Sequence, residues 1–149
     1  MKIRKFLIAI ITLILVILVI FFISHKISNQ NYETKRYKLG GIEVNLKIAD
    51  SPEERQKGLS QIYNLDEKDG MIFIFGEPSI LSFWNKDTFL DLDVVWIKDD
   101  TIVGITPLQK EEKGRQIINS PVPCNIVIEL NQGFCQKYNI KIGDKLEIM

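Results

Sequence analysis

The distribution of hydrophobic residues divides the chain into one long apolar segment near the N-terminus and a longer region of short, alternating segments. Residues 6–23 are all apolar except Thr12. A helix of that length, rising about 1.5 Å per residue, spans roughly 27 Å, which is nearly the thickness of the hydrocarbon core of a bilayer. The pattern therefore predicts a transmembrane anchor at 6–23, preceded by a cytoplasmic N-terminus at 1–5.

The charges that flank this segment predict its orientation. Lys2, Arg4 and Lys5 lie on its N-terminal side, whereas Lys26 is the only basic residue on the other side before Lys35. This bias favours a cytoplasmic N-terminus and an extracytoplasmic domain on a single-pass membrane protein. The alternative is a domain secreted after signal cleavage, although no small-x-small cleavage site follows the apolar segment.

Two further regions follow the apolar segment. Residues 24–38 are polar and lack periodicity, which predicts a linker. Residues 39–149 have the composition of a globular domain.

Within this domain, residues 42–48 alternate apolar and polar positions, as a half-buried strand does. The sequence Ser51-Pro52-Glu53-Glu54 combines an N-cap, a first-turn proline and a capping-box glutamate, and predicts a short helix over 52–57.

Short strands and turns dominate the rest of the domain. Residues 71–75 are a continuous apolar run between glycines, as in a central strand. Asp99-Asp100 separates two strand patterns and predicts a β-hairpin. The predicted elements are strands at 92–98, 101–106, 126–130 and 145–149, a charged loop at 109–115 and a second short helix ending near Tyr138. Together they predict an α+β fold, in which a mostly antiparallel or mixed sheet closes into a barrel-like core with two short helices.

The composition excludes several kinds of chemistry for this domain. His25 is the only histidine and lies beside the apolar segment, so the domain lacks the base of a Ser-His-Asp or Cys-His system. Without histidine, two cysteines cannot complete a tetrahedral zinc site, and we expect neither a metal nor a cofactor. Three of the 19 basic residues precede the apolar segment, so the remainder has an acidic excess, which argues against a nucleic-acid partner.

The two cysteines leave two structures open. Cys124 falls at the start of a predicted strand and Cys135 on the following helix. In an oxidising exterior they can form a disulfide. They fit equally well as two separate, buried, small side chains.

The densest cluster of polar and aromatic residues is 83–93, before a predicted strand. Asp87, Asp91 and Asp93 can accept hydrogen bonds from sugar hydroxyls, coordinate Ca²⁺ or serve as acid and base, and Trp84 offers a stacking face. The competing interpretation is structural: the tryptophan is core, Lys86 pairs with an acid, and the aspartates cap turns.

Five ordered motifs within residues 42–146 resemble those of the DUF192 family. They are Arg55-x-x-Gly58-Leu59, Gly70-Met71-Ile72-Phe73-x-Phe75, Phe83-Trp84-x-Lys86-x-Thr88-x-x-x-Leu92-Asp93, Ile128-Glu129-Leu130-Asn131-x-Gly133 and Ile140-x-x-Gly143-Asp144. The resemblance implies a small α+β, barrel-like fold, often behind a signal peptide or anchor. It implies no activity, cofactor or catalytic residue, so it transfers a fold and no chemistry.

Some positions match the family's signature and others depart from it. The matching positions, which are candidates for a shared surface, are Arg55, Gly58, Phe83, Trp84, Lys86, Thr88, Asp93, Glu129 and Asp144. The family usually has Met and Asn where this chain has Asn85 and Asp87, Pro where it has Asp91, and Tyr where it has Ile118. A family site that depends on those residues has an altered specificity here.

These observations favour a non-catalytic binding or accessory module of the cell envelope, for a small-molecule, glycan or envelope-protein ligand. The candidate ligand-binding residues are Arg55, Trp84, Lys86, Asp87, Thr88 and Asp93. One alternative is an enzyme acting on envelope glycans through Asp87, Asp91 or Asp93, which predicts two carboxyl groups facing each other about 5–10 Å apart. Another is a structural partner of an envelope protein, which predicts an exposed apolar patch.

Overall fold

The computed structural model describes residues 10–20 and 32–149, and the chain divides into two units, Met1–Asn31 and Tyr32–Met149. In the first unit, residues 10–20 are helical. Within the described residues, no helix is both long and apolar enough to cross a membrane. The anchor predicted at 6–23 extends beyond 10–20 at both ends, and the predicted N-terminus at 1–5 and most of the predicted linker also lie outside the described residues.

The second unit is built on a seven-stranded sheet with the strand order β6-β5-β8-β3-β2-β1-β9. Its strands are β1 (Thr34–Leu39), β2 (Ile42–Ala49), β3 (Asp69–Ser79), β5 (Leu92–Lys98), β6 (Thr101–Leu108), β8 (Cys124–Asn131) and β9 (Leu146–Ile148). A separate two-stranded sheet pairs β4 (Ser82–Trp84) with β7 (Ile117–Asn119). The short helices are α2 (Pro52–Lys57), the 3-10 helix η1 (Glu111–Lys113) and α3 (Phe134–Lys137).

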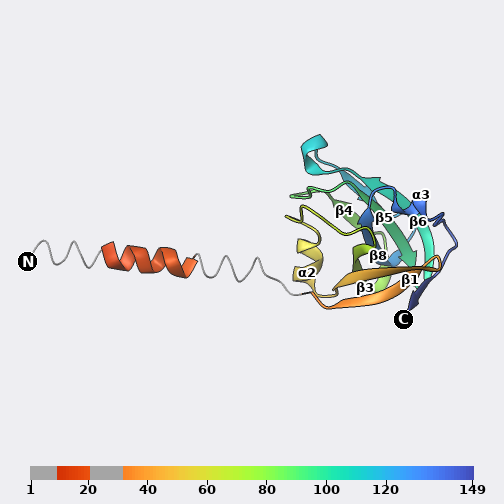
Figure 1. Ribbon diagram of the computed structural model, residues 1–149, viewed down its shortest axis with the longest axis horizontal. Helices are drawn as coiled ribbons and strands as arrows, with labels where there is room; N and C mark the ends of the chain where they lie inside the picture. The colour runs from red at the N-terminus through yellow and green to blue at the C-terminus, as the bar shows by residue number, and fades with distance from the viewer. Residues whose placement is uncertain (1–9, 21–31) are drawn as a thin grey trace, which may run out of the picture. The chain divides into compact units, whose positions relative to one another are not determined.

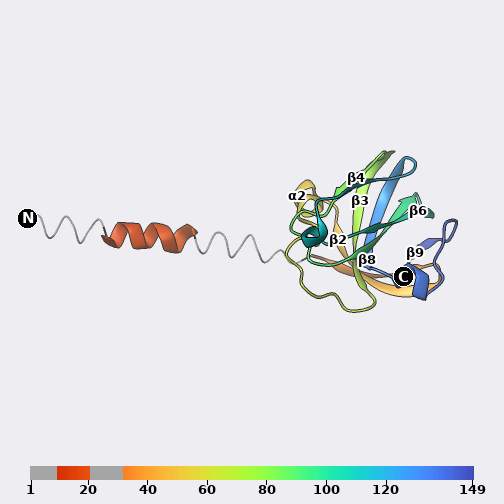
Figure 2. The same ribbon diagram turned by 90° about the horizontal axis from the view of Figure 1, so that it is seen from above.

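The predicted β-rich fold with few short helices is confirmed, and the large sheet is mixed because β2 and β3 are parallel while its other neighbouring strands are antiparallel. Figures 1 and 2 show this sheet curled into a half-barrel. Near its edge strands, β6 and β9, the sheet has one isolated bridge between Thr101 and Lys145, and three backbone hydrogen bonds join residues 100–102 to 143–146 without forming a continuous ladder. The sheet is therefore more open than the barrel predicted from the sequence, because β9 has only three residues to pair.

The predicted helix α2 begins and ends where the sequence pattern placed it. The backbone N–H of Glu54 donates to Ser51 Oγ at 3.3 Å, and the Glu54 carboxylate accepts from the Ser51 backbone N–H at 3.0 Å. These reciprocal bonds satisfy two N–H groups that a helix start leaves without partners. Gly58, with φ of 50°, ends the helix in a conformation that a residue with a side chain rarely adopts.

The large sheet is buried on both faces, and each face has its own apolar cluster. Along β8, Val127 belongs to one cluster and its neighbour Ile128 to the other, because successive side chains of a strand point to opposite faces. The cluster that contains Trp96 also includes Leu59 and Ile118, which lie in the connection after α2 and in β7. The connection after α2 and the short strand β7 therefore cover one face of the sheet. The candidate site lies among these segments.

The start of the domain is corrected by the structure. Residues 34–38, predicted as the end of a linker, belong to β1, and the second unit begins at Tyr32. Tyr37 is buried in the core, while charged side chains on either side of it hide the strand pattern. Gly40-Gly41, with φ values of 58° and 83°, forms the two-residue turn of the β1–β2 hairpin. This pair of glycines was the available signal for a strand before residue 40, but the sequence prediction did not use it.

We expect a chain that begins at residue 39 to fold poorly. Removing residues 34–38 deletes buried Tyr37 and most of the pairing of β1 with β2 and β9. Burial of one large apolar side chain alone contributes about 1.5–3 kcal/mol. Thermal unfolding followed by circular dichroism tests this, with the chain 32–149 as the reference. Equal midpoints for the two chains would show that β1 is dispensable.

Candidate functional site

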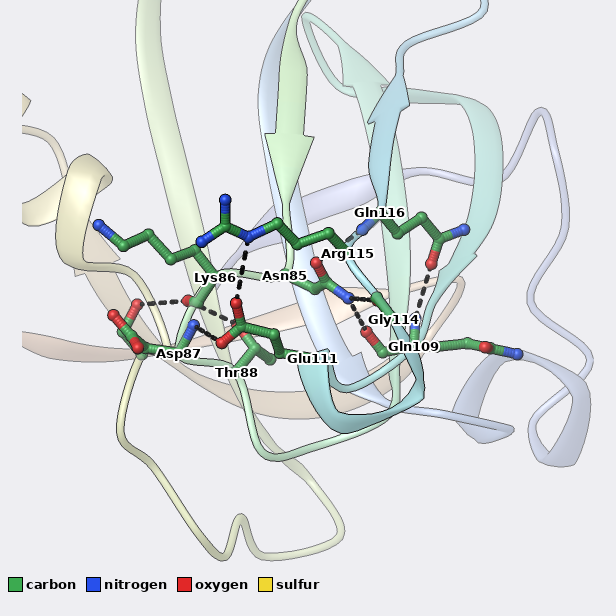
Figure 3. A network of polar contacts seen from close by, with 10 residues as sticks. Asn85, Lys86, Asp87, Thr88, Gln109, Glu111, Gly114, Arg115 and Gln116 are labelled. Atoms are coloured by element: carbon green, nitrogen blue, oxygen red, sulfur yellow. Dashed lines mark hydrogen bonds and ion pairs between the residues drawn. The ribbon is translucent and has the colours of Figure 1, made fainter.

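The segment 83–93, which the sequence singled out, leads from β4 to β5 and packs against the loop 109–116. The two segments are joined through Asn85, whose side chain is 1% exposed. Its Nδ2 donates to the carbonyl oxygens of Gln109 and Gly114 at 2.9 and 2.8 Å, and its Oδ1 accepts from the backbone N–H of Gln116 at 2.8 Å (Figure 3). One amide side chain thereby fixes the course of the 109–116 loop beside β4.

A second set of contacts holds the turn that follows Asn85. Asp87 has φ of 53°, and its backbone N–H donates to Glu111 Oε2 at 2.8 Å. The backbone carbonyl of Thr88 accepts from the Glu111 N–H at 2.9 Å, and the buried Thr88 hydroxyl lies 3.4 Å from the carbonyl oxygen of Lys86 (Figure 3). Through these two hydrogen bonds, Glu111 of η1 holds the backbone of Asp87 and Thr88, which are both predicted ligand-binding residues.

Trp84 forms one wall of a groove on the outer side of this network. It pairs with Ile117 across β4 and β7, and the two side chains are 51% and 70% exposed. The groove has a volume of about 440 Å³ and is lined by Trp84, Asn85, Lys86, Arg115, Gln116 and Ile117. We call it the Trp84 groove.

Two cations border the Trp84 groove. Lys86 Nζ lies 5.4 Å from the centre of the Trp84 ring, within the range of a cation–π contact. Arg115 Nε lies 3.4 Å from Glu111 Oε1 (Figure 3), and the arginine side chain is 81% exposed. The tryptophan is therefore a half-exposed aromatic surface beside positive charge, and the interpretation of Trp84 as a core residue is wrong.

Asp91 and Asp93 have structural partners. Asp91 accepts from Lys113 Nζ at 2.8 Å and from the Lys110 N–H at 3.0 Å, and these bonds lower the pKa of its carboxyl group. Asp93 Oδ2 accepts from the backbone N–H groups of Gly133 and Cys135 at 3.1 and 2.9 Å, at the start of α3. Neither aspartate lines either of the pockets described in this section.

No group of three or more His, Cys, Asp or Glu side chains that could hold a metal ion is found within residues 10–20 and 32–149. The two cysteines, which the sequence left open as a disulfide, are free. Cys124 and Cys135 are buried in the two different apolar clusters of the sheet. Burial raises the pKa of both thiols, that of Cys135 to about 12, so neither has the character of a reactive thiolate.

Arg55 joins α2 to the sheet. Its Nη1 donates to the carbonyl oxygens of Ile74, at 3.0 Å, and Asp50, and its guanidinium carbon lies 5.0 Å from the centre of the Phe75 ring. These contacts hold the C-terminal half of α2 against β3. They also place Arg55 on a second, smaller pocket.

This second pocket, the Glu129 pocket, shares Trp84 with the groove as a lining residue. Its volume is about 30 Å³, and it is lined by Arg55, Gln56, Lys57, Gly58, Leu59, Ser60, Phe73, Phe83, Trp84, Thr88 and Glu129. Glu129 is 5% exposed and pairs in register with Met71 of β3 and Val94 of β5, both apolar core residues. Desolvation by burial raises the pKa of Glu129 to about 8.

Glu129 appeared in the sequence only as a position of the family signature, not among the candidate ligand-binding residues. The available signal was its place in the strand pattern Ile-Val-Ile-Glu-Leu, since an acidic residue in a central, doubly buried strand carries a high desolvation cost. Of the predicted residues, the structure brings Arg55, Trp84 and Thr88 to the Glu129 pocket and Trp84 and Lys86 to the Trp84 groove. Asp87 and Asp93 line neither.

We expect Asn85→Ala to destabilise the domain and loosen the 109–116 loop. The substitution leaves two carbonyl groups and one N–H without their partner, and one buried unsatisfied group costs about 1–3 kcal/mol. Chemical denaturation measures the loss, and amide hydrogen exchange of 109–116 localises it. Asn119→Ala is the matched control, because the Asn119 side chain bonds Ser82 at the exposed surface. Similar losses in the two variants would contradict the role given to Asn85.

Comparisons with known proteins agree with this architecture. One similar protein, from Sinorhizobium meliloti 1021, has a crystal structure and is described as a proposed transcription regulator. Its sequence is 31% identical to this chain and its structure aligns with a TM-score of 0.75, over 80% of this chain and 97% of that chain. A protein of unknown function from Novosphingobium aromaticivorans DSM 12444 is 24% identical with a TM-score of 0.68, over 78% and 84% of the two chains. No curated protein matches. The model of the family DUF192, described as an uncharacterised ACR, matches residues 35–148, and the chain belongs to this family.

Proposed function

We propose that the domain is a non-catalytic binding module of the cell envelope, which holds a small anionic ligand with a flat apolar face in the Trp84 groove. The observation that carries this proposal is the exposed Trp84 ring beside two cationic side chains, Lys86 and Arg115, in one groove. An indole face stacks on planar rings and on the apolar faces of sugars. A volume of about 440 Å³ lies within the usual range of ligand sites.

The charges of the groove favour an anion over a neutral ligand. Lys86 and Arg115 are its only ionisable lining residues among those that the structure describes. Charge-assisted hydrogen bonds to a carboxylate or phosphate are roughly twice as strong as neutral ones. Acidic glycans and small aromatic acids combine this charge with a flat face.

The arrangement of carboxylates supports binding over the alternative of a glycan enzyme. Asp91 and Asp93 are held by structural hydrogen bonds, and none of the three predicted carboxylates lines the groove. An acid–base pair acting on a glycosidic bond needs two carboxyl groups that flank one cleft. Among the residues that the structure describes, none with a carboxylate lines the Trp84 groove, although Glu111 pairs with Arg115 beside it.

A second candidate function, docking of an envelope protein, is favoured by the exposed cross-strand pair of Trp84 and Ile117. Two large, exposed apolar side chains on adjacent strands are typical of the centre of a protein-binding surface. The regulatory role described for the Sinorhizobium protein is not part of our proposal, because the part of the chain after the apolar segment has more acidic than basic residues, which is unsuited to binding DNA.

The location in the envelope is part of the proposal. Residues 6–23 are long and apolar enough in sequence to anchor the chain, and the basic residues before them favour an extracytoplasmic domain. An anchored domain stays close to the membrane surface without needing a lipid-binding surface of its own.

We expect the full chain to remain in the membrane fraction after an alkaline carbonate wash, and a chain lacking residues 1–31 to leave it. The reason is that the apolar segment alone supplies the membrane affinity in this proposal. Protease treatment of intact spheroplasts then reports the side on which the domain lies. A full chain released by carbonate, or a domain protected from external protease, would contradict the proposed location.

We expect Trp84→Ala to weaken ligand binding at least tenfold, a loss of about 1.4 kcal/mol, while leaving the fold intact. The ligand panel is uronic acids, muramic-acid-containing peptidoglycan fragments, aromatic carboxylates and neutral sugars, screened first by thermal shift and then by calorimetry. Lys86→Gln and Arg115→Gln should weaken binding of the acidic ligands most strongly at low salt.

Trp84→Phe and Ile142→Ala are the controls for this experiment. The first keeps an aromatic face in the groove, and the second removes a 66% exposed apolar side chain elsewhere. Binding lost equally in Ile142→Ala, or a collapse of the melting temperature in Trp84→Ala, would contradict the groove. If no member of the panel binds and only an envelope protein is captured by wild type and lost by Trp84→Ala, the second candidate function replaces the first.

A further inference from the structure

The Glu129 pocket contains a buried carboxyl group that the fold itself does not use. The side chain is 5% exposed and lines the pocket, yet within the part of the chain that the structure describes, no group donates a hydrogen bond to it. The other buried acid, Asp93, accepts two backbone hydrogen bonds. The Glu129 oxygens are not among the fully enclosed side-chain atoms without a partner, which in the described residues are represented by Tyr32 Oη, so the carboxyl group opens onto the pocket. A desolvated acid that lines a pocket is a candidate for a functional site.

The surroundings of Glu129 keep its carboxyl group uncharged near neutral pH. From β3 and β5 it is flanked by Met71 and Val94, and the pocket wall includes Phe73 and Phe83, none of which stabilises a negative charge. Desolvation is the only cause of the pKa shift to about 8. A protonated carboxylic acid donates one hydrogen bond, as a carboxylate cannot.

The charged groups that line the same pocket are both cationic. Arg55 and Lys57 come from α2, while the segment after β4 contributes only the uncharged side chain of Thr88. Apart from Glu129 itself, no acidic residue within 10–20 and 32–149 lines the pocket. The Arg55 guanidinium is held by two backbone carbonyls and the Phe75 ring, and neither cation contributes to the pKa of Glu129, so both border the pocket away from the carboxyl group. The cations disfavour an ammonium group in the pocket, and the hydrogen bond to a negatively charged acceptor comes from Glu129.

We infer that the Glu129 pocket is a binding site for the terminal carboxylate of a small organic acid, which accepts a hydrogen bond from the Glu129 carboxyl group. The free volume of about 30 Å³ exceeds the roughly 10–15 Å³ that one water requires, so it admits a small terminal group while the remainder of the acid extends past the pocket mouth. This site goes beyond the proposed function, since its floor lies outside the Trp84 groove.

The test measures binding of propionate to the full chain in a non-ionic detergent, with propylammonium and 1-propanol as probes of similar size. Ligand-observed NMR titrations between pH 7 and 9.5 give the dissociation constant of each probe. Neither propionate nor propylammonium changes its charge substantially in this range. Because only the protonated Glu129 donates, propionate affinity should be constant below about pH 8 and fall by about tenfold per pH unit above it.

Glu129→Gln keeps a hydrogen-bond donor at this position but removes the group that loses its proton as pH rises. The amide still donates a hydrogen bond, so this variant should bind propionate at pH 7 within a few fold of wild type and show no fall between pH 8 and 9.5. Glu129→Leu, of similar size but without a donor, should lose binding at every pH. The Glu129→Gln result distinguishes direct donation from a merely structural role, since a structural role predicts no change in the pH profile.

Several outcomes would overturn the inference. They are absence of propionate binding to the wild-type chain, affinity that rises with pH, tighter binding of propylammonium or 1-propanol than of propionate, and a pH profile that persists in Glu129→Gln. Arg115→Gln distinguishes this test from that of the proposed function, because Arg115 lines the Trp84 groove and not the Glu129 pocket. That variant should weaken ligands of the groove and leave the propionate profile unchanged.

Discussion

The three hydrogen bonds of the Asn85 side chain are the interaction on which the Trp84 groove depends. The 109–116 loop has few apolar residues and only a 3-10 helix of three residues, so it cannot hold its own course. Asn85 satisfies backbone groups near both ends of this loop and thereby sets the position of Arg115 beside β4. Because Trp84 precedes Asn85 and Lys86 follows it, one buried amide places the aromatic and cationic walls of the groove together.

The resemblance to DUF192 gives this interaction a particular meaning. The family usually has methionine where this chain has Asn85, and methionine cannot make these three hydrogen bonds. The groove geometry described above is therefore a property of this chain more than of the family. Glu129, Arg55, Trp84 and Thr88 match the family signature, so the Glu129 pocket is the part of the site that the family resemblance covers.

The buried glutamate is costly to the folded state. Its pKa is raised from 4.5 to about 8, so the folded protein loses stability relative to the unfolded chain as pH rises through this interval. Above about pH 8 the penalty is complete. A leucine at this position would avoid the penalty and match its neighbours in the strand. Retention of the acid is thus better explained by binding than by packing.

The sequence predicted the elements whose signals are local. The capping box of α2 and the turn at Asp99-Asp100 are of this kind, as is the apolar run in β3. It did not predict β1, β4 or β7, because the two latter strands have three residues each and β1 alternates only one buried tyrosine with charges before Leu39. Among the site residues, Trp84, Lys86, Arg55 and Thr88 were found from the motif, but their division between two pockets depends on long-range packing.

Trp84 connects the two pockets physically. It lines both, half exposed, and its ring is in contact range of Lys86 on the groove side. A ligand that stacks on the indole in the groove restricts the same side chain that forms a wall of the Glu129 pocket. The two proposed ligands would therefore share one wall, and the first to bind would restrict this side chain before the second arrives. An acid long enough to pass Trp84 would gain from both sites at once, because its second contact would be intramolecular.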